Sequence, residues 1–155
     1  MSIRTDSTHF YDRRWELWKQ AKYFPKLPAC SDLSLTFVLG QNNFGFSWGT
    51  HKRKYSGTKL DLSDSTVELK IVKMSYAPSL PDESRGEEWI STTTLCTIVG
   101  TVTSPDTDGE VVFSLSDADT DAVGDYLGQI RVTNNTSGKI TAPGYVRFHF
   151  LESLF

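Results

Sequence analysis

Hydrophobic and polar residues alternate with a period of two along much of the chain. In the run Val67–Ile71 the odd positions are aliphatic and the even ones are charged, and GEVVFSL (109–115) repeats the pattern. This period is typical of a strand with one buried and one solvated face. Five such segments, separated by Asp, Gly and Pro, are 60–73, 93–102, 109–115, 124–133 and 145–152. They predict an all-β, antiparallel β-sandwich.

Short motifs mark the ends of these segments. They are Asp-Leu-Ser at 61–63, Asp-Gly-Glu-Val-Val-Phe-Ser-Leu at 108–115, an Asp-x4-Gly-x-Tyr corner ending at Tyr126, Ile-x-Val-Thr at 130–133 and Val-x-Phe-x-Phe at 146–150. In this order they resemble the immunoglobulin-like domain of phage upper-baseplate (tail) proteins over residues 32–151, with the opening strands in 33–48. The resemblance implies an immunoglobulin-like sandwich and a structural role in a phage particle.

The corner at GDYLG (124–128) carries part of this resemblance. In immunoglobulin-like sandwiches a Tyr near the start of strand F donates a hydrogen bond to upstream backbone and fixes the turn before it. Tyr126 is similar to that Tyr, but Gly128 stands where an antibody domain would have Cys. The resemblance therefore implies a structural role for Tyr126 and no disulfide at this corner.

Charge divides the chain into an N-terminal arm, 1–30, and a body, 31–155. The arm has six basic and three acidic residues, whereas the body has ten basic and sixteen acidic ones. Six of the nineteen aromatic residues lie between positions 10 and 24. We expect a basic, aromatic arm attached to an acidic sandwich.

The spacing within 8–24 predicts a short helix in this arm. Tyr11, Trp15 and Trp18 fall on one helical face, and Pro25 follows the last turn. The helix would either fold back over an open end of the sandwich or dock into another subunit, and a solvated tail is a third possibility. Trp and Tyr are favoured interface anchors. The predicted partner-binding residues are Phe10, Tyr11, Trp15, Trp18 and Phe24.

Two further segments are candidate contacts. The Pro-rich stretch 74–92 contains one large anchor, Trp89, and is predicted to form a second contact. The basic run His51–Lys54 lies between two aromatic residues. It is interpreted as a solvated hairpin tip, with a phosphate-contacting loop and docking to an acidic face of a neighbouring copy as alternatives.

Catalytic, metal and membrane functions have little support in the sequence. The three histidines, His9, His51 and His149, lack metal-ligand spacing and a nearby nucleophile motif. The acidic run 117–121 starts like an EF-hand loop, but Ala122 replaces its Gly. No apolar run approaches the length of a membrane span, and the first residues lack a signal-peptide core. We expect no enzyme, cofactor, metal, nucleic acid or membrane partner.

The two cysteines are not spaced like the pair of a disulfide-bonded immunoglobulin domain. Cys30 lies at the end of the arm, and Cys96 lies within a predicted strand. We interpret Cys96 as a reduced, packed side chain rather than half of a disulfide.

Two hypotheses for function remain. The first is a non-enzymatic structural protein of a phage particle, serving as a baseplate or tail adaptor, a neck component or a capsid decoration. Its arm would anchor it to other virion proteins and to copies of itself, and the resemblance implies rings of three or six copies. The second is a carbohydrate-binding module for attachment to the host surface. Its candidate stacking residues are Trp48, Tyr55, Tyr76 and Trp89.

Overall fold

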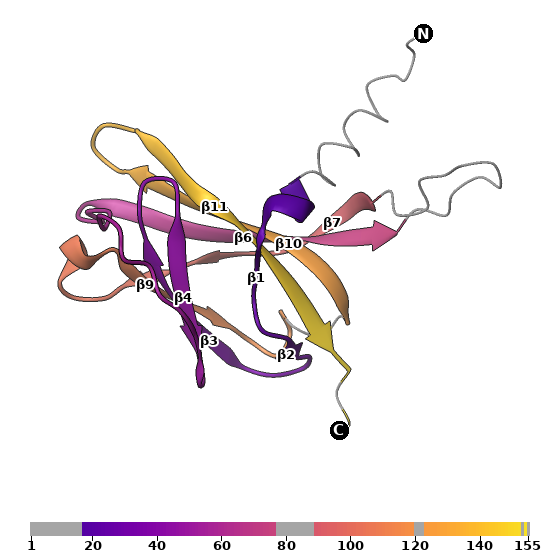
Figure 1. Cartoon of the computed structure of the whole chain (residues 1–155). Coiled ribbons are helices and arrows are strands. Elements are labelled where there is room, and N and C mark those ends of the chain that lie inside the picture. The colour runs from indigo at the N-terminus through magenta and orange to yellow at the C-terminus, as the bar shows by residue number, and fades with distance from the viewer. Residues whose placement is uncertain (1–16, 77–88, 120–122, 153, 155) are drawn as a thin grey trace, which may run out of the picture.

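Two β-sheets packed face to face make up the fold (Figure 1). The computed structural model describes residues 17–76, 89–119, 123–152 and 154, with backbone alone for 74–76 and 89–95. Strands from both halves of the described chain contribute to each sheet. The predicted all-β sandwich is therefore confirmed.

The larger sheet has the strand order β1-β11-β10-β6-β7, and β2 also pairs with β11. Its strands are β1 (Lys22–Tyr23), β2 (Leu27–Pro28), β6 (Ser65–Tyr76), β7 (Trp89–Val99), β10 (Gly124–Asn134) and β11 (Ile140–Leu151). The smaller sheet has the order β5-β4-β3-β9-β8. Its strands are β3 (Leu33–Leu39), β4 (Phe44–Trp48), β5 (His51–Arg53), β8 (Thr101–Val102) and β9 (Glu110–Leu115).

The strand pairing follows the immunoglobulin arrangement. In the smaller sheet, β3, β9 and β8 correspond to strands B, E and D of an immunoglobulin domain. In the larger sheet, β6, β10 and β11 correspond to strands C, F and G. In both sheets these strands are neighbours in the same order as in the immunoglobulin fold. β7 is an additional strand beside C. The first strands depart from the standard arrangement: the place beside B belongs to the β4–β5 hairpin, whereas β1 and β2 run parallel to β11.

The apolar residues that alternate with polar ones in the sequence are the residues buried in the core. Along β3, residues 33, 35, 37 and 39 are buried and the residues between them are not. The same alternation buries Val67, Leu69 and Ile71 in β6. Phe37 meets Phe113 edge to face, with ring centroids 5.6 Å apart. Among the described residues, no buried side-chain nitrogen or oxygen lacks a hydrogen-bond partner.

Gly128 lies at the position where an antibody domain has a disulfide-bonded cysteine, and its surroundings leave no room for a side chain. A Cβ on Gly128 would lie 2.6 Å from the ring of Phe148 and 3.0 Å from a methyl group of Val146. Real Cβ contacts are not this short, so the Phe148 ring occupies the space that any side chain at 128 would need. Aromatic packing thus takes the place of a crosslink.

The short helix predicted in the N-terminal segment is present, but in the described residues it ends earlier than predicted. In the described part of the range 8–24, only residues 17–20 are helical, and the chain then runs alongside β11. The amide of Phe24 donates to the carbonyl of Arg147 (3.1 Å), and that of Ala29 donates to Leu151 (2.8 Å). Pro28, which has no N–H, is tolerated here because the segment lies at the sheet edge.

Residues 22–29, assigned to the arm from charge, are thus part of the sandwich. Phe24 is only 2% exposed. The centroid of its ring lies 4.7 Å from that of Phe46 and 5.3 Å from that of Phe148. Leu27 and Ala29 are buried in the same core. The division at residue 30 therefore does not coincide with an edge of the core. Residues 1–16 of the predicted arm lie outside the described residues.

Replacing Phe24 should weaken the whole sandwich, because its ring fills the space between the sheets. We expect Phe24→Ala to lower the free energy of unfolding by about 3–5 kcal/mol, measured by urea denaturation. Lys26→Ala, at an exposed position two residues away, is the control and should change it by about 0.5 kcal/mol or less. Equal stability of the two variants would show that Phe24 is not a core residue.

The two cysteines should differ in reactivity. Both are free, with Cys30 exposed and Cys96 partly buried against the core. Burial, with a smaller contribution from Asp119, raises the pKa of the Cys96 thiol to about 12. Since the thiolate is the nucleophile, iodoacetamide at pH 8 should modify Cys30 first and Cys96 only after unfolding. Mass spectrometry checks this, and simultaneous modification of both in the folded protein would contradict it.

Candidate functional site

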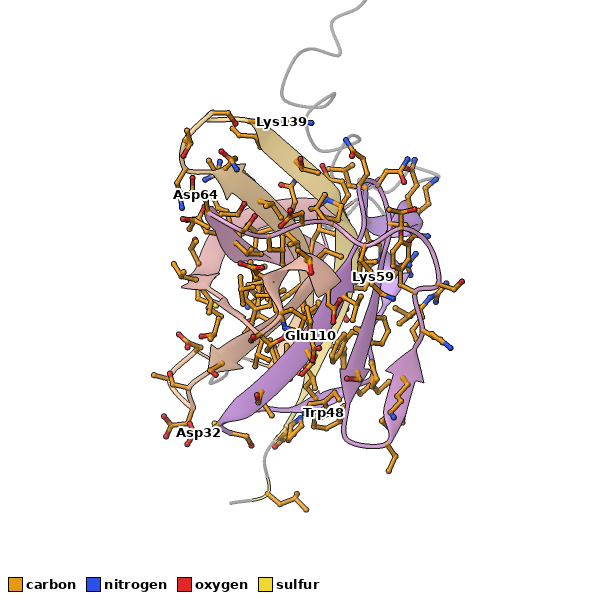
Figure 2. All side chains as sticks on the ribbon, turned by 90° about the vertical axis from the view of Figure 1, so that its left-hand side faces the viewer. Asp32, Trp48, Lys59, Asp64, Glu110 and Lys139 are labelled. Carbon is orange, nitrogen blue, oxygen red and sulfur yellow. The ribbon has the colours of Figure 1, made fainter. Side chains whose placement is uncertain are left out.

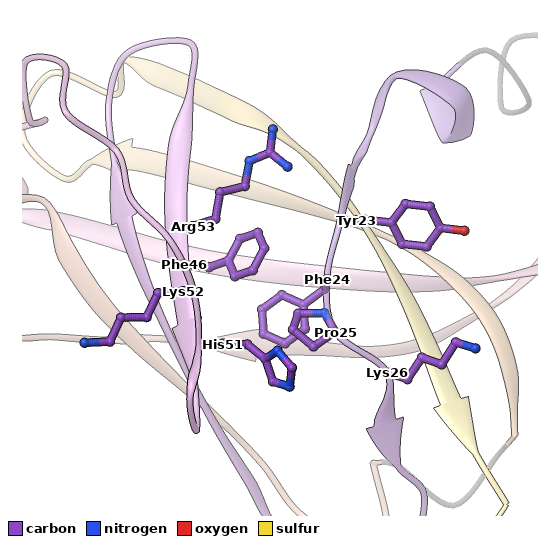
Figure 3. A pocket seen from close by; sticks show the side chains of 8 residues that line it. All are labelled: Tyr23, Phe24, Pro25, Lys26, Phe46, His51, Lys52 and Arg53. Atoms are coloured by element: carbon purple, nitrogen blue, oxygen red, sulfur yellow. The ribbon is translucent and has the colours of Figure 1, made fainter.

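A cleft opens where the edges of the two sheets meet, between the β4–β5 hairpin and the segment that follows β1 (Figure 3). Its volume is about 500 Å³. The residues lining it are Tyr23, Phe24, Pro25, Lys26, Phe46, His51, Lys52 and Arg53. One wall belongs to the larger sheet and the other to the smaller, so the cleft exists only because both edges are in place.

The floor of the cleft is apolar. Phe24 and Phe46 are both buried, and Pro25 lies beside them. Figure 3 shows these three rings turned toward the gap, with the His51 ring next to them. A ligand group that enters the cleft would therefore meet aromatic and aliphatic carbon at the bottom.

The geometry of β5 determines which basic side chains face the cleft. His51 lies opposite Trp48 and Arg53 opposite Phe46 in the register with β4. Because strand residues alternate between faces, His51 and Arg53 share the side of Phe46, while Lys52 points to the other side (Figure 3). The His51 ring is stacked on Trp48, with centroids 6.2 Å apart and an interplanar angle of 7°.

A second cation, Lys22, lies next to Arg53. Its ammonium group donates a hydrogen bond to the carbonyl of Phe44 and sits 4.6 Å from the centroid of that ring. Burial lowers the pKa of Lys22, and the nearby positive charge of Arg53 lowers it further. Lys22 and Arg53 together make this edge of the sandwich positively charged, and the Lys22 ammonium is held by the carbonyl and ring of Phe44.

Positive charge is concentrated on this side of an otherwise acidic body. No Asp or Glu occurs between Leu33 and Leu60, and four of the ten basic residues of the body lie between 52 and 59. Figure 2 shows Lys59 on the side of the β4–β5 hairpin, across the view from Asp32 and Asp64. A second hollow of about 380 Å³ lies on the outer side of β5 and includes Lys54 and Lys59.

Two side-chain contacts between basic and acidic residues lie outside the cleft. Arg131 pairs with Glu68 at 2.9 Å, and His149 with Asp125 at 2.5 Å. In the part of the chain that the structure describes, the cations that line the cleft are not neutralised by a carboxylate.

Arg147 holds the helical turn against the larger sheet and so positions the cleft wall. Its Nε donates to the carbonyl of Trp18 (2.6 Å), and its Nη2 donates to that of Lys19 (2.8 Å). The guanidinium also lies 5.1 Å from the Trp18 ring centroid and 4.8 Å from that of Tyr23. These contacts fix the residues that lead into β1.

The predicted anchor residues fall into two groups. Trp18 packs with Ala21 and Leu127, and Phe24 belongs to the main core, so both are buried by this chain's own sandwich. This placement matches the interpretation in which the segment folds back on the body and corrects the assignment of Trp18 and Phe24 as partner-binding residues. Phe10, Tyr11 and Trp15 lie outside the described residues.

Trp89 and Tyr126 were the other predicted site residues. Trp89 begins β7, where its backbone pairs with Tyr76, and its side chain lies outside the described part. Tyr126 is fully buried in β10 and meets Phe150 edge to face at 5.4 Å. Tyr126 therefore lies in the core near the start of the strand that corresponds to F.

The aromatic residues considered for a carbohydrate platform belong to different sheets. Trp48 ends β4 in the smaller sheet, whereas Tyr76 and Trp89 pair at the ends of β6 and β7 in the larger one. Tyr55 is partly buried, and its hydroxyl donates to the carbonyl of Thr58 (2.9 Å). The four residues do not come together as one group on a single sheet.

Only one of the two walls of the cleft could be identified from the sequence. The basic run in β5 is evident, but it was interpreted as a hairpin tip, whereas the tip is formed by Gly49 and Thr50 and the run continues as an edge strand. On the opposite wall, residues 23 and 24 were assigned to the end of a helix and Pro25 to its termination. The sequence feature that could have indicated a positively charged surface here is the absence of Asp and Glu from 33 to 60.

No protein-family model matches the chain, and no curated protein matches it significantly. In the described ranges, no three His, Cys, Asp or Glu side chains are grouped so that they could hold a metal ion. Nor does any helix there have the length and apolar character needed to cross a membrane.

Removing the Tyr126 hydroxyl should destabilise the fold without disturbing the ring packing. Tyr126→Phe keeps the contact with Phe150 but removes the hydroxyl and its hydrogen bond, since no buried side-chain oxygen among the described residues lacks a partner, at a cost of about 1–3 kcal/mol in unfolding free energy. Tyr23→Phe is the matched control, because Tyr23 is 65% exposed. Chemical denaturation compares the two, and unchanged stability of Tyr126→Phe would refute a structural role for the hydroxyl.

Proposed function

We propose that the chain is a non-enzymatic structural protein of a phage particle that binds other virion proteins and copies of itself. The observation that carries this proposal is the cleft at the paired sheet edges, with its apolar floor and unneutralised cations. Aromatic and Arg side chains are the commonest energetic centres of protein interfaces. The order of the strand motifs, which resembles phage upper-baseplate proteins, supports the same role.

The sandwich is suited to repeated use in an assembly. Its core is closed by packing alone, both cysteines are free, and its buried side-chain polar groups are satisfied among the described residues. Such a domain presents its edges and loops without large rearrangement. Within the proposal, the location is the virion, at the baseplate, tail, neck or capsid surface, and Phe10, Tyr11 and Trp15 remain proposed anchors to the neighbouring component.

Carbohydrate binding has weaker support. Sugar rings stack on exposed aromatic faces, but the candidate aromatics are divided between the two sheets, and Trp48 is already stacked on His51. The aromatic rings in the cleft that the structure does form, Phe24 and Phe46, are buried and belong to its floor, so they do not form an exposed stacking platform. We therefore retain the particle component as the proposed function.

The composition of purified particles tests this proposal. Phage particles separated by density and analysed by mass spectrometry should contain the chain at a fixed, multiple-copy ratio to the major head protein. The control is the soluble fraction of the same lysate. Particles that are intact and infectious but lack the chain would contradict the proposed function, and binding of the purified chain to a host glycan array would favour the carbohydrate alternative.

A further inference from the structure

A separate, smaller pocket lies on the outer face of the larger sheet, beside the segment that joins β1 to β2. Its volume is about 230 Å³. This is less than the volume of a pocket for a drug-sized ligand, so it suits a single small unit. Its polar and aromatic lining residues are Trp18, Tyr23, Lys26, Asp125, Arg147 and His149.

The register of β10 and β11 brings three of these side chains together. In β11, residues 146, 148 and 150 are buried, so Arg147 and His149 lie on the opposite face of the strand. Asp125 of β10 is the cross-strand partner of His149. The Nδ1 atom of His149 lies 2.5 Å from Oδ1 of Asp125, and both side chains are about one-third exposed. The pair is therefore fixed in place while still in reach of a ligand.

The segment alongside β11 supplies the other side of the pocket. Figure 3 shows the side chains of Tyr23 and Lys26 directed to the side away from β5, and both line the pocket. The guanidinium of Arg147 lies 4.8 Å from the centroid of the Tyr23 ring. Tyr23 is nevertheless 65% exposed. Its ring thus still offers aromatic surface to a ligand.

The pocket presents hydrogen-bond donors and acceptors at the same time. Arg147 uses Nε and Nη2 to bind two backbone carbonyls, and these contacts do not involve its Nη1 group. Lys26 adds an ammonium group. Because the carboxylate of Asp125 accepts the Nδ1 proton of His149, Nε2 of the neutral imidazole is an acceptor, as is Oδ2 of Asp125. A ligand with both a carboxylate and hydroxyl groups would use all of these atoms.

We propose that this pocket binds one monosaccharide unit that carries a carboxylate, as a uronic acid does. The sugar carboxylate accepts hydrogen bonds from Arg147 and Lys26, and its hydroxyls donate to Asp125 and His149. The C–H face of the sugar ring packs on Tyr23. This inference goes beyond the proposed function, because it adds a small ligand to a particle component. It also uses none of the four aromatic residues considered for a carbohydrate platform.

Two simpler ligands would use only part of the pocket. An inorganic anion such as phosphate would contact the cationic groups, but the carboxylate of Asp125 would repel it. A neutral sugar would satisfy Asp125 and His149 but would leave Arg147 and Lys26 without an anionic partner in the ligand. Phosphate and glucose are therefore the comparison ligands in the test.

Titration of the full chain with glucuronate, followed by amide NMR, is the first measurement. The amide signals of Tyr23, Asp125 and His149 should shift and reach saturation. Because the carboxylate forms charge-assisted hydrogen bonds, glucuronate should bind about tenfold more tightly than glucose. Phosphate at the same ionic strength should bind about tenfold more weakly than glucuronate.

Variants of the pocket are the second measurement. Lys26→Ala should weaken glucuronate binding about tenfold and leave glucose binding within about twofold of the original. Lys139→Ala removes the same charge at an exposed position outside the pocket and should change neither affinity by more than about twofold. Tyr23→Ala should weaken the binding of both sugars, whereas Tyr23→Phe, which keeps the ring, should retain it. The amide spectrum of each variant shows whether it is folded.

Several results would overturn the inference. They are the absence of saturable shifts with glucuronate, equal affinity for glucuronate and phosphate, and glucuronate binding that is unchanged in both Lys26→Ala and Tyr23→Ala. Glycan-array binding that persists in Tyr23→Ala would also contradict it, because that binding would lie elsewhere on the chain. If particles contain the chain in multiple copies and glucuronate does not bind, only this inference fails. If the chain is absent from particles but glucuronate binds at these residues, the proposed function fails instead.

Discussion

The insertion of Phe24 between the two sheets is the interaction on which the rest of the structure depends. Its ring contacts Phe46 in the smaller sheet and Phe148 in the larger one. Its amide is hydrogen-bonded to Arg147, which also holds the preceding helical turn. One residue thus joins both sheets, closes their common edge and forms part of the cleft floor. Loss of this contact would remove the cleft together with part of the core.

Binding and stability are consequently coupled at this edge. The pairing of β1 with β11 holds Lys22 at this edge, where burial and, to a smaller extent, the charge of Arg53 lower the pKa of Lys22. Uncompensated charge next to a rigid apolar floor is typical of a surface that is completed by a partner.

The longer strands of the sandwich could be predicted from the sequence where apolar and polar residues alternate with a period of two. β3, β6 and β9 show this most clearly, and the immunoglobulin-like strand order follows the motif order. β1 and β2 could not be predicted in this way. They have two residues each, and Pro25 and Pro28 interrupt them. The spacing of Leu17, Ala21 and Phe24 also fits a helix, but only residues 17–20 are helical in the described part, and pairing with β11 determines the conformation of residues 22 and 23.

For the same reason only one wall of the cleft was visible in the sequence. The basic residues of β5 are adjacent in the chain, whereas their counterparts in residues 23–26 approach them only after folding. Amide hydrogen exchange followed by NMR tests the central claim, that residues 22–29 are integral to the sandwich. The amides of Phe24 and Ala29 should be protected to a degree comparable with that of Ile130 in the middle of β10. Rapid exchange at Phe24 and Ala29, with Ile130 still protected, would contradict it.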